Sequence, residues 1–179
     1  MPEVQLECLV VREPYASLIA YGQKRWEFRY RPCRKRSMVG IVSSRSSPIP
    51  INPQVARSRS FPRGALLAVA KLEDCKRVTA EDLVPFVNGH YRRINLHGID
   101  FEVCEPPIGE PVEDVRAAAN DDEWECYAWQ LTSVLRLKKP RLIRSRAYST
   151  WQSVNVNLKP DELVPTQASG SQSSLDWYR

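Results

Sequence analysis

The segment from Gly22 to Arg36, GQKRWEFRYRPCRKR, places one carboxylate among many cations. Glu27 stands three positions after Lys24 and two before Arg29. Residues two apart on a β-strand leave the same face about 7 Å apart, so Glu27 and Arg29 can pair or share a ligand. An ammonium and a guanidinium can grip a phosphate, and a carboxylate can accept a hydrogen bond from a base amino group. The spacing therefore predicts a site for an anionic, base-bearing ligand.

Glu27 also has a simpler interpretation. It lies between Arg25 and Arg29, and exposed ion pairs on strands are common and individually weak. On this view the segment is a solvated strand face that binds nothing. Mutation distinguishes the two interpretations. If the segment is a binding site, substitutions of Lys24, Glu27 and Arg29 should affect function far more than stability.

The elements that must position these residues can be read from local patterns. Val4 to Val11 is apolar enough for a buried strand, and a short helix is expected next, with Pro14 in its first turn and Gly22 just past its end. From Lys24 the pattern has a period of two, which predicts a half-buried strand. Its core face is expected to hold Trp26, Phe28 and Tyr30, and its opposite face Arg25, Glu27, Arg29 and Arg31.

The remaining chain alternates between apolar runs and loops. Further strands are expected at Met38 to Ser44, Gly64 to Cys75, Glu125 to Leu137 (closed by Lys138, Lys139 and Pro140) and around Trp151, with helices opening at Thr79 and after Pro111. Residues 43–63 are expected to form a long loop and 88–123 a variable insertion. Residues 160–179 are expected to be a disordered tail, because PTQASGSQSS has almost no apolar surface to bury.

Composition limits the classes of protein. At 179 residues and 20.5 kDa, with no apolar run of about 18 residues and no secretory signal, we expect one domain that is cytoplasmic and makes no membrane contact. A net charge of +5 favours polyanionic partners. The five cysteines are widely spaced and odd in number, and His90 and His97 lack ligand spacing, so reduced thiols, no metal and no cofactor are expected.

The order of these features resembles the ASCH domain (activating signal cointegrator homology), a branch of the PUA-like β-barrel superfamily. The matching segments are PYASL in the helix, the G-x-K-x-x-E-x-R motif from Gly22 to Arg29, GALLAVAKLEDC and YAWQLTSVLRL. The resemblance spans roughly Leu6 to Leu137. It implies an α+β fold over residues 1–159, a PUA-like mixed β-barrel of five to six strands with short flanking helices.

The resemblance also implies binding of RNA or a nucleotide-like ligand in a cleft beside the first helix and the motif strand. The residues expected there are Tyr15, Lys24, Glu27, Arg29, Arg31, Arg34 and Lys35. Tyr15 or Trp129 could supply a stacking surface for bases, although a core position is the better expectation for Trp129. The basic run ending at Arg36 would join Lys138 to Arg146 in one phosphate-binding surface if the two adjoin in space.

Two other classes of function stay open. Some proteins that resemble this family are amidohydrolases acting on acylated cytidine or proposed ribonucleases, in which case Lys24 would be a base or electrostatic stabiliser and Glu27 an acid or base. Glu27 stands where the amidohydrolase branch has threonine, which counts against that chemistry. Cys33 as a nucleophile is a minor alternative. The third class is a protein-interaction module using the long loop and the tail.

Overall fold

The computed structural model describes residues 3–49, 53–78, 91–104, 126–143 and 150–166. The elements are, in order, β1 (Val4–Val11), α1 (Tyr15–Ala20), β2 (Trp26–Arg29), β3 (Met38–Ser43), α2 (Pro53–Arg57), β4 (Ala65–Arg77), β5 (Tyr91–Leu96), β6 (Ile99–Cys104), β7 (Tyr127–Leu142), β8 (Trp151–Val156), the 3-10 helix η2 (Pro160–Glu162) and β9 (Leu163–Pro165). The strands and the first helix expected from the sequence are confirmed in type and place. The expected loop at 43–63 contains the short α2, and the helices expected at Thr79 and after Pro111 lie outside the described residues.

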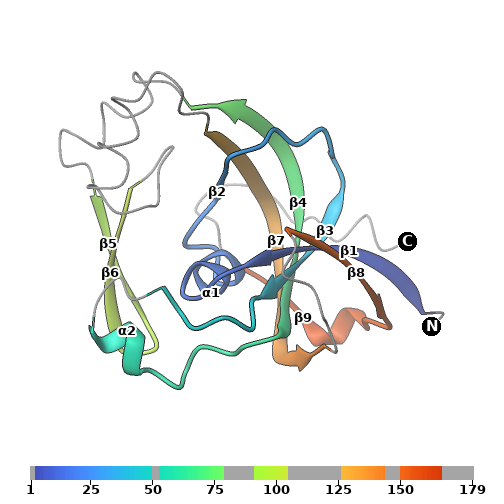
Figure 1. Cartoon of the computed structure of the whole chain (residues 1–179). Coiled ribbons are helices and arrows are strands. Elements are labelled where there is room, and N and C mark those ends of the chain that lie inside the picture. The colour runs from blue at the N-terminus through green and yellow to red at the C-terminus, as the bar shows by residue number, and fades with distance from the viewer. Residues whose placement is uncertain (1–2, 50–52, 79–90, 105–125, 144–149, 167–179) are drawn as a thin grey trace.

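Seven strands form one strongly curved sheet in the order β2-β7-β4-β3-β1-β8, with β9 paired to β7. The β1–β3 pair is parallel, and the other pairs in this sheet are antiparallel. Figure 1 shows the sheet curving around α1. The mostly-strand architecture with short helices is thus confirmed. Within the described residues no pairing joins β2 to β8, so the closed barrel stays a prediction.

The sheet has a hydrophobic core on each face. Leu72 and Leu131 pack in the cluster that also contains Ile19 of α1, whose residues are all buried. Leu66 and Leu135 belong to a second cluster, nearer β8 and β9. Because successive side chains of a strand point to opposite faces, β4 and β7 supply both cores. The short helix is therefore held by packing rather than by helix propensity.

Part of the expected insertion at 88–123 is a β-hairpin, formed by β5 and β6. Its turn uses His97 and Gly98, both with positive φ (55° and 76°), as a two-residue hairpin turn requires. The His97 ring lies edge-on to Tyr21 and Phe61, at 5.5 Å between ring centroids in each case. The hairpin therefore covers the core beside the end of α1, which explains its buried Leu96, Ile99 and Phe101.

Two expected boundaries are wrong. Strand β7 does not end at Lys138–Pro140 but continues to Leu142, which pairs with Ala65. Pro140 is tolerated because it falls in an irregular stretch, where the register shifts between the pairs Ala68–Arg136 and Leu66–Arg141, and no ladder N–H is needed from it.

The second boundary is the start of the C-terminal tail. The sequence predicts a disordered tail from residue 160, yet residues 160–165 form η2 and β9. Leu163 pairs with Leu137 and is buried, and Glu162 forms a 2.8 Å ion pair with Arg141. One leucine next to the polar stretch supplies enough apolar surface to dock the segment. Residues 167–179 lie outside the described part of the chain.

Candidate functional site

The turn between α1 and β2 fixes the position of Lys24. Gly22 has φ of 71°, the left-handed conformation expected just past a helix end. The carbonyl of Leu18 accepts hydrogen bonds from the backbone N–H groups of Gln23 (2.8 Å) and Lys24 (3.0 Å). The backbone of Lys24 is thereby tied to the last turn of α1.

The Lys24 side chain is buried, with 2% of it exposed. Its Nζ donates to Glu27 Oε2 at 2.9 Å and to the carbonyl oxygen of Trp26. The same ammonium lies 5.2 Å from the centre of the Tyr15 ring and 5.4 Å from that of Phe28. A carboxylate, a carbonyl and two aromatic faces therefore replace the water that this charge loses on burial.

Glu27 lies between two cations and is itself buried, with 7% of its side chain exposed. Oε2 contacts Lys24, and Oε1 contacts Arg29 Nη2 at 2.9 Å. Burial alone would raise the pKa of Glu27, but the charges and hydrogen bonds of Lys24 and Arg29 outweigh it and lower that pKa below 4.5. Glu27 is an ionised carboxylate at neutral pH, and we call Lys24, Glu27 and Arg29 the charged triad.

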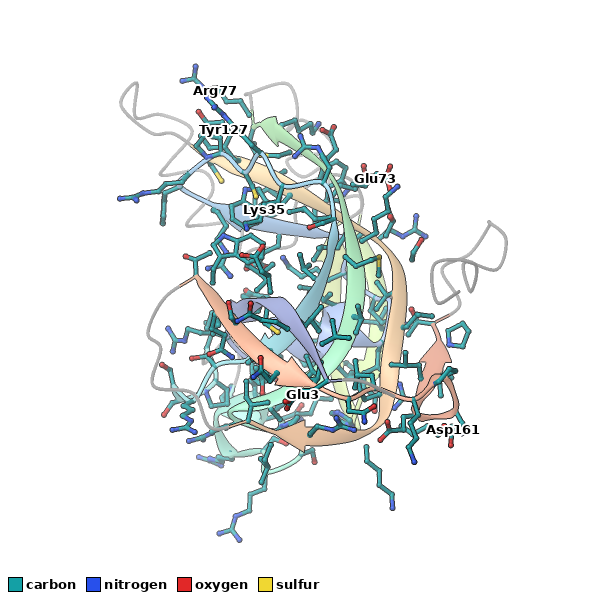
Figure 2. The ribbon with its side chains drawn as sticks, turned by 90° about the vertical axis from the view of Figure 1, so that its right-hand side faces the viewer. Glu3, Lys35, Glu73, Arg77, Tyr127 and Asp161 are labelled. Carbon is teal, nitrogen blue, oxygen red and sulfur yellow. The ribbon has the colours of Figure 1, made fainter. Side chains whose placement is uncertain are left out.

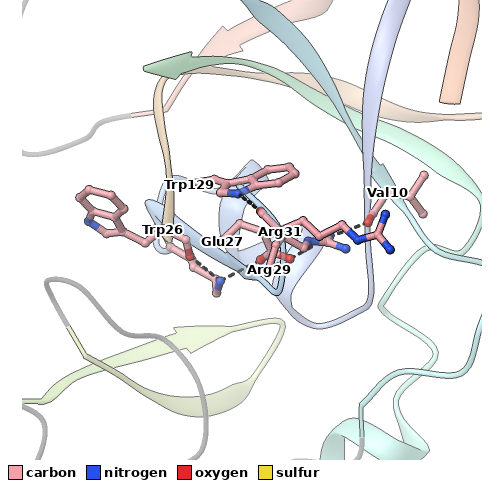
Figure 3. Close-up of polar contacts among 7 residues, drawn as sticks. Val10, Trp26, Glu27, Arg29, Arg31 and Trp129 are labelled. Carbon is pink, nitrogen blue, oxygen red and sulfur yellow. Dashed lines mark hydrogen bonds and ion pairs between the residues drawn. The ribbon is translucent and has the colours of Figure 1, made fainter. Parts of the chain in front are cut away.

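Arg29 is the most accessible member of the charged triad, with 22% of its side chain exposed. Its Nη2 bridges Glu27 and the carbonyl oxygen of Val10 in β1, at 2.9 and 2.7 Å (Figure 3). Its Nε is buried and has no hydrogen-bond partner among the described residues. The guanidinium is thus anchored through Nη2, while about a fifth of the side chain stays accessible to solvent.

The expected assignment of strand faces is wrong. The face predicted to be polar carries the buried Glu27, whereas Trp26 and Phe28 are only half-buried and Tyr30 is 77% exposed. A period of two shows that the faces differ but does not show which one points inward. Glu27 can point inward because both neighbouring cations neutralise it. The interpretation of Glu27 as part of a solvated strand face is therefore wrong too.

Trp129 is a core residue rather than a stacking surface for bases. It pairs in register with Glu27, is 2% exposed and stacks on Trp151 at 5.6 Å between ring centroids. Its Nε1 donates to the carbonyl oxygen of Arg31 at 3.1 Å, which ties the chain leaving β2 to β7 (Figure 3). The core expectation for Trp129 is confirmed.

The other expected site residues lie on the connection from β2 to β3. Arg31 and Arg34 are exposed. Lys35 differs, because its Nζ pairs with Glu7 and lies 5.2 Å from the centre of the Trp151 ring. Of these three side chains, Arg31 and Arg34 face the solvent, whereas Lys35 is held by its two neighbours.

The two basic segments do not adjoin. Arg29 pairs with Tyr127 at the start of β7, and Lys139 lies twelve residues further along that strand, roughly 40 Å by strand rise. Figure 2 shows Lys35 toward the end of the molecule that carries Tyr127, and Asp161 beside the far end of β7. The single phosphate-binding surface is therefore wrong for Lys138, Lys139 and Arg141; Arg144 and Arg146 lie outside the described residues.

Sequence reasoning missed a second buried carboxyl group. Glu13 is fully buried, and its two oxygens accept hydrogen bonds from the backbone N–H and the hydroxyl of Ser17, both at 3.0 Å. Burial raises the pKa of Glu13 to about 7, although the two hydrogen bonds from Ser17 oppose the shift. An acidic residue four positions before a serine, at a helix start between two apolar runs, was the available signal.

Several absences hold for the described residues alone. No group of three or more His, Cys, Asp or Glu side chains in that part of the chain could hold a metal ion. Within the same residues, no helix is long and apolar enough to span a membrane. Cys8, Cys33, Cys75 and Cys126 form no disulfide bond.

The comparison with protein families decides the identity of the domain. The family model described as the ASCH domain matches residues 9–141. This chain belongs to the ASCH domain family. The family resemblance drawn from the helix and the G-x-K-x-x-E-x-R motif is thereby confirmed, and the charged triad of this ASCH domain lies inside the matched region.

Comparisons with individual proteins say less about this chain than the family model does. The ASCH domain is similar to the crystal structure of a mutant of the ZmASCH protein from Zymomonas mobilis, with 15% sequence identity and a TM-score of 0.46. The likeness covers 76% of this chain and 75% of that chain. Among curated proteins no relative matches.

Proposed function

We propose that this ASCH domain binds RNA or a nucleotide-like ligand beside α1 and β2, and that Arg29 is the group of the charged triad that meets the ligand. The observation that carries the proposal is that the buried carboxylate of Glu27 holds two cations, the buried Lys24 and the partly exposed Arg29. Exposed arginines follow along the same connection, and the chain has a net charge of +5. Both features suit a polyanion.

Stability alone does not account for the charged triad. Removing an ammonium and a carboxylate from water costs several kcal/mol per ion, and well-packed apolar residues of similar volume are often as stable or more so. The burial of Lys24 and Glu27 therefore serves a purpose other than stability. It fixes the orientation of the partly exposed Arg29 guanidinium before the ligand arrives, which lowers the entropy lost on binding.

The exposure of each side chain indicates which residues can contact the ligand directly. Lys24 and Glu27 are almost fully enclosed. Their polar atoms already contact each other, the Trp26 carbonyl oxygen and Arg29. We therefore assign them as positioning residues, in place of the direct base and phosphate contacts expected from the sequence. Tyr15, which is 7% exposed, supports Lys24 in the same way.

A guanidinium has donors and no acceptor, so the ligand group at Arg29 must be an acceptor. Phosphate oxygens and base carbonyl oxygens both qualify, and a phosphate gains the stronger charge-assisted hydrogen bonds. Arg31 and Arg34 would then meet neighbouring phosphates of a single strand.

The hydrolase alternative is less well supported by the same contacts. A general base must reach the proton that it removes. Lys24 Nζ is enclosed and already donates to Glu27 and to the Trp26 carbonyl. Binding without turnover is the function that this geometry favours.

Fluorescence anisotropy with labelled single-stranded RNA tests the proposal. Loss of charge-assisted bonds worth about 1.5–3 kcal/mol predicts that Arg29→Gln weakens affinity roughly tenfold or more. Arg141→Gln is the matched control, because Arg141 is paired and 34% exposed at the far end of β7. A log–log salt plot should have a slope of roughly −3 if about four phosphates are contacted.

Two further measurements make the result decisive. Arg31→Gln should flatten the salt slope without changing the melting temperature, because Arg31 is exposed. Wild type that shows no RNA binding, or Arg29→Gln that binds like Arg141→Gln, would refute the assignment. Turnover of acylated nucleosides that is lost in Lys24→Ala would establish the hydrolase instead.

A further inference from the structure

Two cysteines that are distant in the sequence meet where the chain leaves β2. Cys33 lies on the connection from β2 to β3, and Cys75 lies in β4, 42 positions further along the chain. The backbone N–H of Cys33 donates to the Sγ of Cys75 at 3.2 Å. We propose that Cys33 and Cys75 form a reversible dithiol–disulfide pair, a modification site that does not depend on the proposed function.

The backbone places the two residues within reach of a disulfide. An N–Cα bond of about 1.46 Å puts the Cys33 Cα within about 4.7 Å of the Cys75 sulfur. Disulfides join residues whose Cα atoms are about 4.4–6.8 Å apart, and the Cys75 sulfur already lies beside the Cys33 backbone. Rotation of the Cys33 side chain is then the main adjustment that bond formation requires.

A second, independent contact holds the same two segments together. Arg36 Nη1 donates to the carbonyl oxygen of Cys33 at 2.9 Å, and Arg36 Nη2 contacts Asp74 Oδ1 at 3.2 Å. The same Asp74 oxygen accepts the backbone N–H of Cys75 at 2.7 Å. Arg36 and Asp74 therefore link the backbones of both cysteines, so the pair is positioned before any oxidant arrives.

Access differs among the thiols. Cys75 is half-buried, Cys33 is 8% exposed, and Cys8 and Cys126 are 0% and 4% exposed. A small oxidant such as a peroxide should therefore reach Cys75 before the other three thiols whose surroundings are described. Cys33 then serves as the resolving thiol, because its own backbone already contacts the Cys75 sulfur.

The reaction balances with a peroxide as the oxidant. The Cys75 thiolate attacks one oxygen of hydrogen peroxide, the O–O bond breaks and hydroxide departs. Cys75 is then a sulfenic acid. The Cys33 thiolate attacks that sulfur, the S–S bond forms and a second hydroxide leaves. The two thiol protons convert both hydroxides to water. The thiols lose two electrons, and the peroxide gains them.

The disulfide would clamp the connection after β2 onto the sheet. Cys75 in β4 lies opposite Trp129 in β7, which lies opposite Glu27 in β2, so the bond would join the chain leaving β2 to the second strand away from it. Closing a loop of this length restricts the unfolded chain, and we expect the melting temperature to rise by roughly 5–15 °C.

Peptide mapping of the full chain tests the proposal directly. Wild type is treated with one equivalent of hydrogen peroxide, remaining thiols are alkylated, and the protein is digested with trypsin. The expected product joins the peptide of residues 30–34, YRPCR, to that of residues 72–76, LEDCK. Its mass is the sum of the two peptides less two hydrogen atoms, and a dithiol reductant should separate them.

Melting curves provide the second readout. The rise on oxidation should reverse with reductant and be absent in Cys75→Ser, whereas Cys126→Ser should keep it. If either variant does not fold, the wild-type mapping still decides. Alkylation of both Cys33 and Cys75 after peroxide, a linkage between other cysteines, or a melting temperature that falls on oxidation would overturn the proposal.

Discussion

Replacing Glu27 by Gln tests whether the charged triad is a coupled buried unit. The substitution keeps the volume and one acceptor oxygen, but it removes the negative charge that faces Lys24 and Arg29. Because Lys24 is only 2% exposed, its ammonium cannot recover solvation in the folded state. Arg29, at 22% exposure, regains part of its hydration.

These contacts set the expected magnitude. Breaking a buried ion pair by removing one partner costs about 3–5 kcal/mol. The retained amide and the partial exposure of Arg29 place Glu27→Gln near the lower limit, about 3 kcal/mol. For a chain of this size, that loss lowers the melting temperature by roughly 6–12 °C. The sequence alone predicted an effect mainly on function; the burial of Glu27 adds a large effect on stability.

Urea unfolding of wild type and Glu27→Gln measures the difference. Glu73→Gln is the control, because Glu73 is also a strand carboxylate paired with a lysine, Lys71, but is exposed to solvent. The double variant Lys24→Met with Glu27→Leu should recover most of the loss, since it removes the uncompensated charge. If Glu27→Gln unfolds like Glu73→Gln, or the double variant is worse than Glu27→Gln, the coupled-unit reasoning is refuted.

Two other predictions concern stability. Because burial raises the pKa of Glu13 to about 7, the folded chain keeps a proton that the unfolded chain releases near pH 4.5. The stability that this proton adds to the folded state is fully present below pH 4.5 and is lost as the pH rises through 7. Urea titrations at each pH should show wild type losing up to about 3 kcal/mol over that window, a loss that Glu13→Gln avoids, and parallel profiles would contradict it. A chain ending at Lys159 should melt roughly 6–12 °C below one ending at Thr166, because it loses the burial of Leu163, about 1.5–3 kcal/mol, and the β7–β9 hydrogen bonds. Equal melting temperatures would mean that β9 adds no stability.

Local patterns predicted the parts of the site that local rules govern. The helix start at Pro14 and the left-handed Gly22 follow from the backbone preferences of two residue types, and both appear as expected. The pairing of Glu27 with Arg29 follows from a spacing of two on a strand. These features need no information from distant segments, so one sequence suffices for them.

The direction of the strand face could not be predicted in the same way. Trp26 and Phe28 are more apolar than Glu27, and hydrophobicity alone turns them inward. The observed inversion depends on Lys24 folding back from the helix end and on the Val10 carbonyl that anchors Arg29. Both contacts come from elements outside the strand. A local pattern does not contain them.

The contacts that the sequence concealed most completely are those between distant segments. Cys33 meets Cys75 only because β7 lies between β2 and β4 and the chain after β2 must cross back to reach β3. The separation of 42 residues matches no short cysteine motif, so the sequence predicted reduced thiols and gave no sign that two of them meet. The same sheet order places Glu27 of the charged triad and Cys75 on opposite sides of Trp129 in β7. A chemical change at the cysteines would therefore act on the chain segment that carries Arg31 and Arg34 away from the triad.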